Sequence, residues 1–234
     1  MPFSKYKIIS IENSQDVRIY RMEPLDKKML IFVPGQSVFL HLLDSEGKTI
    51  QKRPYSIASS PNSPYLEFAI KMVGGAMTSQ LDLLKIGAIL GVEGPVGHFT
   101  YNEQKNICLI ACGTGVAPML SIVRHVAGKK LTGNFVLIYS TRTTDSILYK
   151  NEFNRLNELN QNIKTVITLT REQHPENWDG ELGRINRDMI LKNVKDPKNN
   201  DWWICGSMEF IKTMKFILGE IGVDMKKVNI EGWG

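Results

Sequence analysis

Cysteine is scarce in this chain of 234 residues, which contains only Cys108, Cys112 and Cys205. An odd, small number of cysteines does not make a disulfide framework. Three well-separated thiols also cannot supply the four cysteine ligands of an iron–sulfur cluster. Cys108 and Cys112 lie in an apolar run and are expected to fill a core strand. The sequence therefore predicts no metal site, and any redox centre must be an organic cofactor.

Long apolar runs and concentrated positive charge are also lacking. No apolar run approaches the roughly 18 residues that a membrane-spanning helix needs, and the N-terminal residues lack the apolar core of a signal peptide. We therefore expect a cytoplasmic protein with no membrane span. The net charge is +5, but no dense basic stripe with interleaved aromatics is present, so we expect no nucleic-acid binding. A mild positive excess can steer an acidic partner or an anionic ligand.

The N-terminal part of the chain consists of short β-prone runs separated by Gly, Pro, Asn, Asp and Ser, a pattern typical of an antiparallel sandwich or barrel. The runs are Tyr6–Ile11, Val17–Met22, Ser37–Leu43, Thr49–Ser59, Tyr65–Met72 and Ala88–Val92. The turn Pro34–Gln36 separates a further strand, expected at Leu30–Val33, from the run at Ser37. One helical stretch, Gly75–Leu84, is expected in this half.

After Gly97 the pattern changes to apolar runs that alternate with helical stretches, which predicts a parallel sheet covered on both faces. The expected strands are Ile107–Ala111, Asn134–Tyr139, Ile163–Leu169 and Trp202–Cys205. The expected helices are Ala117–Val126, Leu148–Leu159, Arg187–Val194 and Met208–Ile221. We therefore expect a barrel domain at residues 1–103 and an α/β domain with a five-stranded parallel sheet at residues 104–234.

Arg53-Pro54-Tyr55-Ser56 combines three chemical functions in one extended run. An arginine can clamp a phosphate with two hydrogen bonds, a tyrosine can lie flat against a ring system, and a serine can offer one hydrogen bond to a ring nitrogen. Strand alternation places Arg53, Tyr55 and Ile57 on one face and Pro54 and Ser56 on the other. Phosphate, ring face and ring edge are the parts of a flavin nucleotide. An ordinary edge strand is the alternative interpretation.

Gly113-Thr114-Gly115 follows the first strand of the second half and opens the helix at Ala117. In a doubly wound sheet this is where the phosphates of a ligand lie at a helix N-terminus. Pro118 suits the first helical turn because its missing N–H is not needed there. The run lacks the common Gly-x-Gly-x-x-Gly spacing, and a tight turn used for packing alone is the alternative.

Taken in order, five motifs resemble the ferredoxin–NADP reductase family of flavoproteins over nearly the whole chain. They are Arg53–Ser56, Gly74–Ser79, Gly113–Pro118, Cys205–Ser207 and Glu231–Gly234. The resemblance implies that FAD binds the barrel and a nicotinamide nucleotide binds the α/β domain, with hydride passing between the two rings. The terminal Trp233 matches the aromatic residue that covers the flavin where nicotinamide must enter, so its displacement would precede hydride transfer.

The resemblance also implies roles for individual residues. Those at the reacting rings are Ser56, Cys205, Glu231 and Trp233. Those expected to hold FAD are Arg53, Tyr55, Ser56, Gly75 and Thr78. Those expected to hold NAD(P) are Gly113, Thr114, Gly115, Pro118 and Arg171. Further cofactor contacts are expected at Pro54, Lys71, Met77, Arg142, Thr170, Cys205, Gly206 and Trp233. For Trp233, a packing role is the alternative.

The run Thr170-Arg171-Glu172-Gln173 resembles the stretch that holds the 2′-phosphate of NADP in plant-type members, which favours NADP(H) over NAD(H). The Lys-x-Tyr that follows in those members is absent here. FMN is the alternative to FAD, because relatives bind it with the same Arg-x-Tyr-Ser motif.

The expected partner is an electron-acceptor protein such as ferredoxin or flavodoxin, which suits the basic charge of the chain. A free flavin, a haem protein or an oxygenase component fits the motifs equally. A second hypothesis is an electron-transfer subunit of a larger complex, although the cysteine cluster of the subunit that serves dihydroorotate dehydrogenase is absent. A third is a nucleotide-binding regulator without turnover.

Overall fold

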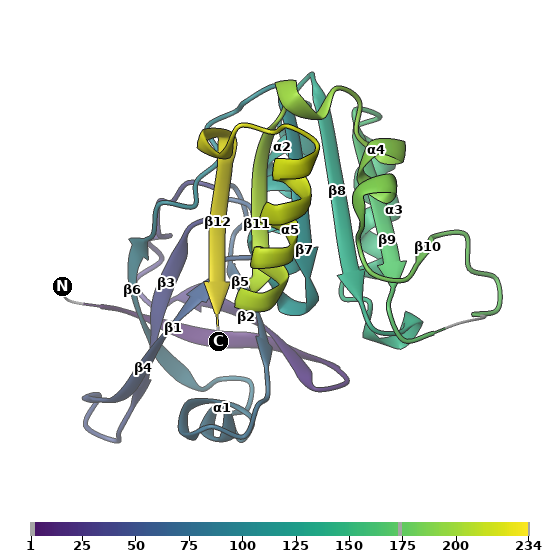
Figure 1. The fold of residues 1–234 in the computed structure, drawn as a ribbon. Coiled ribbons are helices and arrows are strands. Elements are labelled where there is room, and N and C mark those ends of the chain that lie inside the picture. Colours follow the sequence, from purple (N-terminus) through teal and green to yellow (C-terminus); the bar gives the residue numbers. More distant parts are fainter. Residues whose placement is uncertain (1–2, 173–174, 234) are drawn as a thin grey trace.

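The structure is a computed structural model that describes residues 3–172 and 175–233. Two layers are stacked on each other, with a β-barrel below and an α/β domain above in the view of Figure 1. The last strand of the chain runs downward from the α/β domain, and its end lies beside the barrel (Figure 1). The architecture confirms the expected order of an antiparallel domain followed by an α/β domain.

The barrel is a six-stranded antiparallel sheet with the order β4-β3-β6-β1-β2-β5. Its strands are β1 (Ser4–Ser14), β2 (Val17–Pro24), β3 (Ser37–Leu43), β4 (Thr49–Ser56), β5 (Leu66–Lys71) and β6 (Ile89–Val96). The two edge strands meet just beyond β4, where the Ala58 N–H donates to the Glu67 carbonyl at 2.8 Å. This bond closes the curled sheet.

Two expectations for the barrel are wrong in detail. Residues Leu30–Val33 form no strand, because side chains satisfy their backbone donors: Leu30 N–H donates to the Tyr6 hydroxyl at 3.0 Å, and Val33 N–H donates to Gln36 Oε1 at 2.8 Å. Helix α1 is shorter than expected, at Ala76–Leu81. The chain beyond it continues in tighter turns, with Leu84 N–H donating to the Leu81 carbonyl at 3.0 Å.

The α/β domain contains a parallel sheet of six strands, one more than expected, in the order β10-β9-β8-β7-β11-β12. The strands are β7 (Asn106–Cys112), β8 (Asn134–Thr141), β9 (Ile163–Leu169), β10 (Glu181–Leu182), β11 (Asp201–Ser207) and β12 (Val228–Trp233). Only four of the five expected strands were located in the sequence, and neither edge strand is among them, because β10 is only two residues long and β12 carries the terminal motif.

Helices cover both faces of this sheet, with α4 and α5 in front and α2 and α3 behind in Figure 1. Their bounds are α2 (Val116–Gly128), α3 (Lys150–Leu159), α4 (Arg187–Asn193) and α5 (Met208–Glu220). The sequence of β7 shows why: Ile107 and Leu109 pack with α2 and α3, whereas Cys108 and Ile110 pack with α4 and α5. Residues 107–111 of β7 are all apolar because both faces of the strand are buried there. In the described part of the chain, no helix has the length and apolarity to cross a membrane.

The core behind the parallel sheet continues into the barrel. Val17, Ala58 and Ala69 of the barrel belong to the same buried cluster as Leu120 and Val123 of α2. Helix α2 is consequently buried on nearly all sides, because it packs between the parallel sheet and the barrel. The two domains thus share one apolar interface, which fixes where their ligand sites lie relative to each other.

We predict that Gly35→Ala destabilises the protein. Gly35 has φ +97°, and a Cβ there would lie 2.4 Å from the Phe99 carbonyl oxygen. Strain of about 2 kcal/mol corresponds to a melting temperature lower by about 4–8 °C. Differential scanning fluorimetry measures this shift. The control is Gly128→Ala at the end of α2, where a Cβ meets nothing within 4 Å; equal melting temperatures for the two variants would contradict the prediction.

Candidate cofactor site

A cavity of about 490 Å³ opens on the barrel beside β4, β5 and α1, and we call it the barrel cavity. Its walls include Arg53, Pro54, Tyr55, Ser56, Lys71, Gly75, Met77 and Thr78, which are all the barrel residues that the sequence assigned to cofactor binding. Four consecutive residues of β4 reach the cavity although strand alternation separates their side chains. This is possible because β4 is an edge strand of its sheet.

The polar groups of the barrel cavity are mostly hydrogen-bond donors on an otherwise apolar wall. They include the Arg53 guanidinium, the Lys71 ammonium and the hydroxyls of Ser56 and Thr78. Burial raises the pKa of Tyr55 to about 12, although Arg53 acts in the opposite direction, so that phenol keeps its proton. Cations, hydroxyls and an aromatic face around an apolar cavity suit an anionic ligand with a planar ring.

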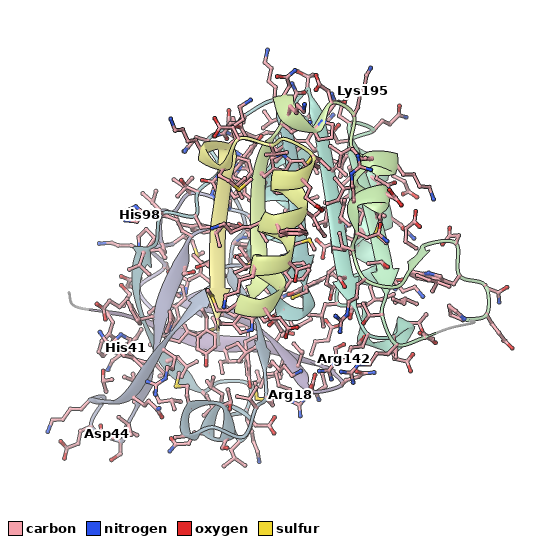
Figure 2. The ribbon with its side chains drawn as sticks, in the orientation of Figure 1. Arg18, His41, Asp44, His98, Arg142 and Lys195 are labelled. Atoms are coloured by element: carbon pink, nitrogen blue, oxygen red, sulfur yellow. The ribbon has the colours of Figure 1, made fainter. Side chains whose placement is uncertain are left out.

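A second cavity, of about 310 Å³, lies at the carboxyl ends of β7, β8 and β9, and we call it the sheet-edge cavity. Gly113, Thr114, Arg142 and Thr170 line it, as the sequence predicts for the nucleotide site. Figure 2 shows Arg142 at the end of the α/β domain that faces the barrel. Ligands in open α/β sheets bind at these carboxyl ends, because the first helical turn offers unpaired N–H groups there.

Three side chains form a wall shared by the two cavities: Lys71, Thr114 and Trp233. Trp233 ends β12 and is 43% exposed, which is a large exposure for tryptophan. β12 pairs in parallel with β11, and Trp233 lies opposite Ser207. This pairing places Trp233 at the boundary between the two cavities.

Glycine suits two positions of the Gly113–Gly115 turn. Gly113 has φ +53°, in the left-handed region that favours glycine. A Cβ on Gly115 would lie 2.4 Å from the Cys205 carbonyl oxygen and 2.8 Å from Cη2 of Trp233. The Gly-Thr-Gly turn therefore lets the tryptophan ring and β11 approach the backbone closely.

A carboxylate from the last strand contacts two serines of the barrel. Ser37 Oγ donates to Glu231 Oε1 at 2.9 Å, and Ser56 Oγ donates to Glu231 Oε2 at 3.3 Å. Burial raises the pKa of Glu231, and the two hydroxyls oppose that rise because they stabilise the charged carboxylate. Ser56 and Glu231 thus meet as the sequence predicts, across 175 residues of chain.

Cys205 is fully buried and lies outside the lining of both cavities. Burial raises the pKa of its thiol, and the nearby Glu231 and Cys112 raise it further, so the thiol keeps its proton. Pro118 and Gly206 are also buried and line neither cavity.

Arg171 is exposed next to Thr170, and its backbone N–H donates to the Arg142 carbonyl at 2.9 Å. Gln173, His174 and Gly234 lie outside the described residues.

Some lining residues were missed by sequence reasoning. The β1–β2 turn, Gln15–Val17, reaches the sheet-edge cavity from the barrel, and Lys71 Nζ binds Asp16 Oδ2 at 3.0 Å. The turn has an ordinary hairpin sequence, which predicts exposure and gives no sign of a ligand. Ser37 follows the Pro34–Gln36 turn at the start of β3, and its position offered no signal for the contact with Glu231.

Comparison with known families divides the chain at the same place as the fold. Residues 6–101 match the oxidoreductase FAD-binding domain, and residues 109–215 match the oxidoreductase NAD-binding domain. The solved structure of a ferredoxin–NADP⁺ reductase from Neisseria gonorrhoeae, with bound FAD and NADP, superposes with a TM-score of 0.83 and covers 99% of each chain. At 19% identity, this likeness shows a common fold.

Sequence relatives fall into more than one group of reductases. The chain is 29% identical over 229 residues to the glycine betaine monooxygenase reductase subunit of Pseudomonas aeruginosa, and it spans 62% of that protein's length. It is 30% identical over 240 residues to ferredoxin–NADP reductase B of Sorangium cellulosum, a match that covers 98% of this chain and 97% of that protein. With both domain families in order and a full-length relative, the chain belongs to the ferredoxin–NADP reductase family of flavin-dependent NAD(P)H reductases.

Proposed function

We propose that the protein takes reducing equivalents from NADPH and passes them through FAD to an electron-acceptor protein. The observation that carries this proposal is the wall of Lys71, Thr114 and Trp233 between the barrel cavity and the sheet-edge cavity. These three residues line both cavities, so a ligand in either cavity would contact the same wall. Such an arrangement suits direct transfer between two rings once Trp233 moves aside. The domain boundary we propose, between residues 103 and 104, lies between β6 and β7.

FAD fits the barrel cavity through the donor set already described. We assign the phosphates to Arg53 and the N-terminal turn at Gly75–Thr78, and the ring to Tyr55 and Ser56. When bound, the flavin supplies the chemistry of accepting a hydride and releasing electrons. The protein's own residues orient the ring: Ser56 is held by Glu231, and Trp233 covers the entry from the sheet-edge cavity.

NADPH is favoured over NADH by positive charge at the sheet-edge cavity. Arg142 and Arg171 follow the carboxyl ends of β8 and β9, and both are exposed. No salt bridge to either side chain is found among the described residues, so both guanidinium groups are available for a 2′-phosphate. The hydroxyl of Thr170 donates to the Thr141 carbonyl at 3.1 Å, which fixes the loop that carries Arg171.

The acceptor we propose is a ferredoxin or flavodoxin, a choice supported by the full-length likeness to ferredoxin–NADP reductase B. A second candidate is an oxygenase component, because the chain resembles a monooxygenase reductase subunit over 96% of its length. Steady-state assays that offer reduced nucleotide with ferredoxin, flavodoxin or oxygenase component as acceptor separate the two. A colourless purified protein that takes up no added flavin would overturn the whole proposal.

We predict that Trp233→Ala strengthens NADP⁺ binding to the FAD-loaded protein by about tenfold, or about 1.4 kcal/mol. The ring occupies the shared wall, so nucleotide binding must first displace it, and removal of the ring abolishes that cost. Titration of the flavin difference spectrum with NADP⁺ measures the Kd. Phe216→Ala, an exposed aromatic on α5, serves as the control and should leave the Kd unchanged. Weaker binding to Trp233→Ala would show that the ring supports the nucleotide.

We predict that Ser37→Ala raises the apparent pKa of Glu231 further. The hydroxyl of Ser37 donates to the carboxylate and favours its charged form. Without this hydrogen bond, less opposes the rise in the pKa of Glu231 that burial causes. The pH dependence of flavin reduction by NADPH should therefore move toward higher pH. Ser45→Ala, on the exposed β3–β4 turn, is the matched control. A profile that stays in place or moves to lower pH would contradict this assignment.

We predict that Arg171→Ala raises the KM for NADPH by about tenfold and leaves the KM for NADH unchanged, because the lost charge faces only the 2′-phosphate (about 1.4 kcal/mol). Steady-state kinetics with both nucleotides provide the measurement. Arg187→Ala, on the exposed start of α4, is the control. Equal changes for NADPH and NADH would place Arg171 on a part common to both nucleotides.

A further inference from the structure

Glu67 is a buried carboxylate at the interface between the two domains. It is the second residue of β5, and its side chain has 0% exposure. Glu67 Oε2 accepts from Nε of Arg21 at 2.6 Å, and Oε1 accepts from Nη1 of Arg124 at 2.7 Å. Arg21 belongs to β2 of the barrel, whereas Arg124 belongs to α2 of the α/β domain. The carboxylate therefore bonds to both domains.

Arg124 uses all three of its nitrogen atoms. Nη1 also donates to the Ala58 carbonyl at 2.9 Å. Nε and Nη2 donate to the two oxygens of Glu152 on α3, at 2.6 and 2.7 Å. The guanidinium carbon lies 5.3 Å from the ring centre of Tyr149. Two guanidinium groups and two carboxylates thus form a network, which we call the interdomain clamp: Arg21, Glu67, Arg124 and Glu152.

A second bond between the domains lies one turn away on the same helix. Ser121 Oγ donates to the Ser59 carbonyl at 2.7 Å, and both groups are buried. Residues three apart on a helix share a face, so Ser121 and Arg124 both form hydrogen bonds to the same barrel segment, Ala58–Ser59. The Ser59 hydroxyl in turn accepts from the Glu67 N–H at 3.1 Å.

The segments that these bonds join, Ala58–Ser59 and helix α2, lie close in sequence to the two cavities. Ala58 and Ser59 follow Ser56, which ends β4 in the barrel cavity. Helix α2, which carries Ser121 and Arg124, begins immediately after the Gly113–Gly115 turn of the sheet-edge cavity. Short stretches of chain therefore connect the clamp to both cavities, so a rotation of one domain at the clamp would displace the residues of the shared wall.

We infer that Glu67 and Arg124 are positioning residues that set the orientation of the nucleotide site relative to the flavin site, and thereby the rate of hydride transfer. This inference rests on the proposed function. Separating Arg124 from Glu67 would leave a buried carboxylate with one partner fewer, and an unpaired buried charge is strongly unfavourable. Other relative orientations of the two domains are consequently disfavoured. Transfer between two bound rings is sensitive to displacements of about 1 Å, so the clamp acts on transfer and leaves the binding of either cofactor intact.

The test begins with the full chain loaded with FAD. Anaerobic stopped-flow mixing of the unaltered protein with NADPH must reduce the flavin; failure here would overturn the proposed function and not only the clamp. Arg124→Met then removes the charge and keeps an apolar side chain. We expect flavin reduction at saturating NADPH to slow by about tenfold or more, while the Kd values for FAD and NADP⁺ change by less than about twofold.

The matched control is Arg155→Met. Arg155 approaches Glu152 from the exposed face of α3, with 3.9 Å between Nη2 and Oε1, and no bond from it to the barrel is found among the described residues. Its rate of flavin reduction should equal that of the unaltered protein. Arg124→Lys should recover part of the rate lost in Arg124→Met, because one ammonium can reach one of the two carboxylates but not replace the bidentate contact.

A stabilising role without positioning predicts a different pattern. Slower reduction that is fully restored by excess FAD or nucleotide would overturn the inference, as would an unchanged rate in folded Arg124→Met. If Arg124→Met does not fold, the same measurements on Glu67→Gln test the inference. The amide keeps the shape of the carboxylate but presents an NH₂ group to one arginine. Its reduction rate must fall with unchanged cofactor Kd values, and an unchanged rate would overturn the inference.

Discussion

The carboxylate of Glu231 accepts hydrogen bonds from Ser37 and Ser56, and this contact joins the last strand of the α/β domain to two strands of the barrel. The contact depends on β12, which pairs with β11 and brings the end of the chain back to the first domain. Without that pairing, a terminal tryptophan would have no fixed place. With it, Trp233 lies against both cavities, so the geometry of the site follows from where the final strand is held.

The apolar interface behind the parallel sheet supports this contact. Helix α2 is buried almost completely, because one side packs on the sheet and the other on the barrel. Polar groups at such an interface need partners, and Arg124, Glu67 and Ser121 satisfy one another or nearby carbonyls. The interface therefore combines apolar area, which gives stability, with a few directional bonds, which restrict the orientation of the domains.

The sequence was sufficient for the fold class, the order of the domains, FAD as cofactor and the family. Local chemistry made this possible: β-prone runs with turn residues, then apolar runs alternating with helices, carry most of the architecture. Neither edge strand of the parallel sheet was located, because β10 pairs through only two residues and leaves almost no pattern, and β12 coincides with the terminal motif. Leu30–Val33 has β-prone residues, but Tyr6 and Gln36 bind its backbone instead of a neighbouring strand.

Within the site, sequence motifs located groups that lie on the cavity walls, such as Arg53–Ser56 and Gly113–Thr114. Motifs did not reveal contacts that arise only when distant segments meet. Ser37 and Glu67 are ordinary strand residues in the sequence, and their roles follow from partners far away along the chain. The assignments of individual residues to FAD and NADP remain predictions for the experiments described above.

The β1–β2 turn, which reaches the sheet-edge cavity from the barrel, has a consequence for engineering. A chimera that exchanges only the α/β domain would divide this cavity between two parent proteins. In such an exchange Gln15, Asp16 and Val17 would come from one parent protein and the rest of the α/β side of the cavity from the other. A graft that moves this hairpin together with the C-terminal half, and that retains lysine at position 71 of the barrel, preserves this lining.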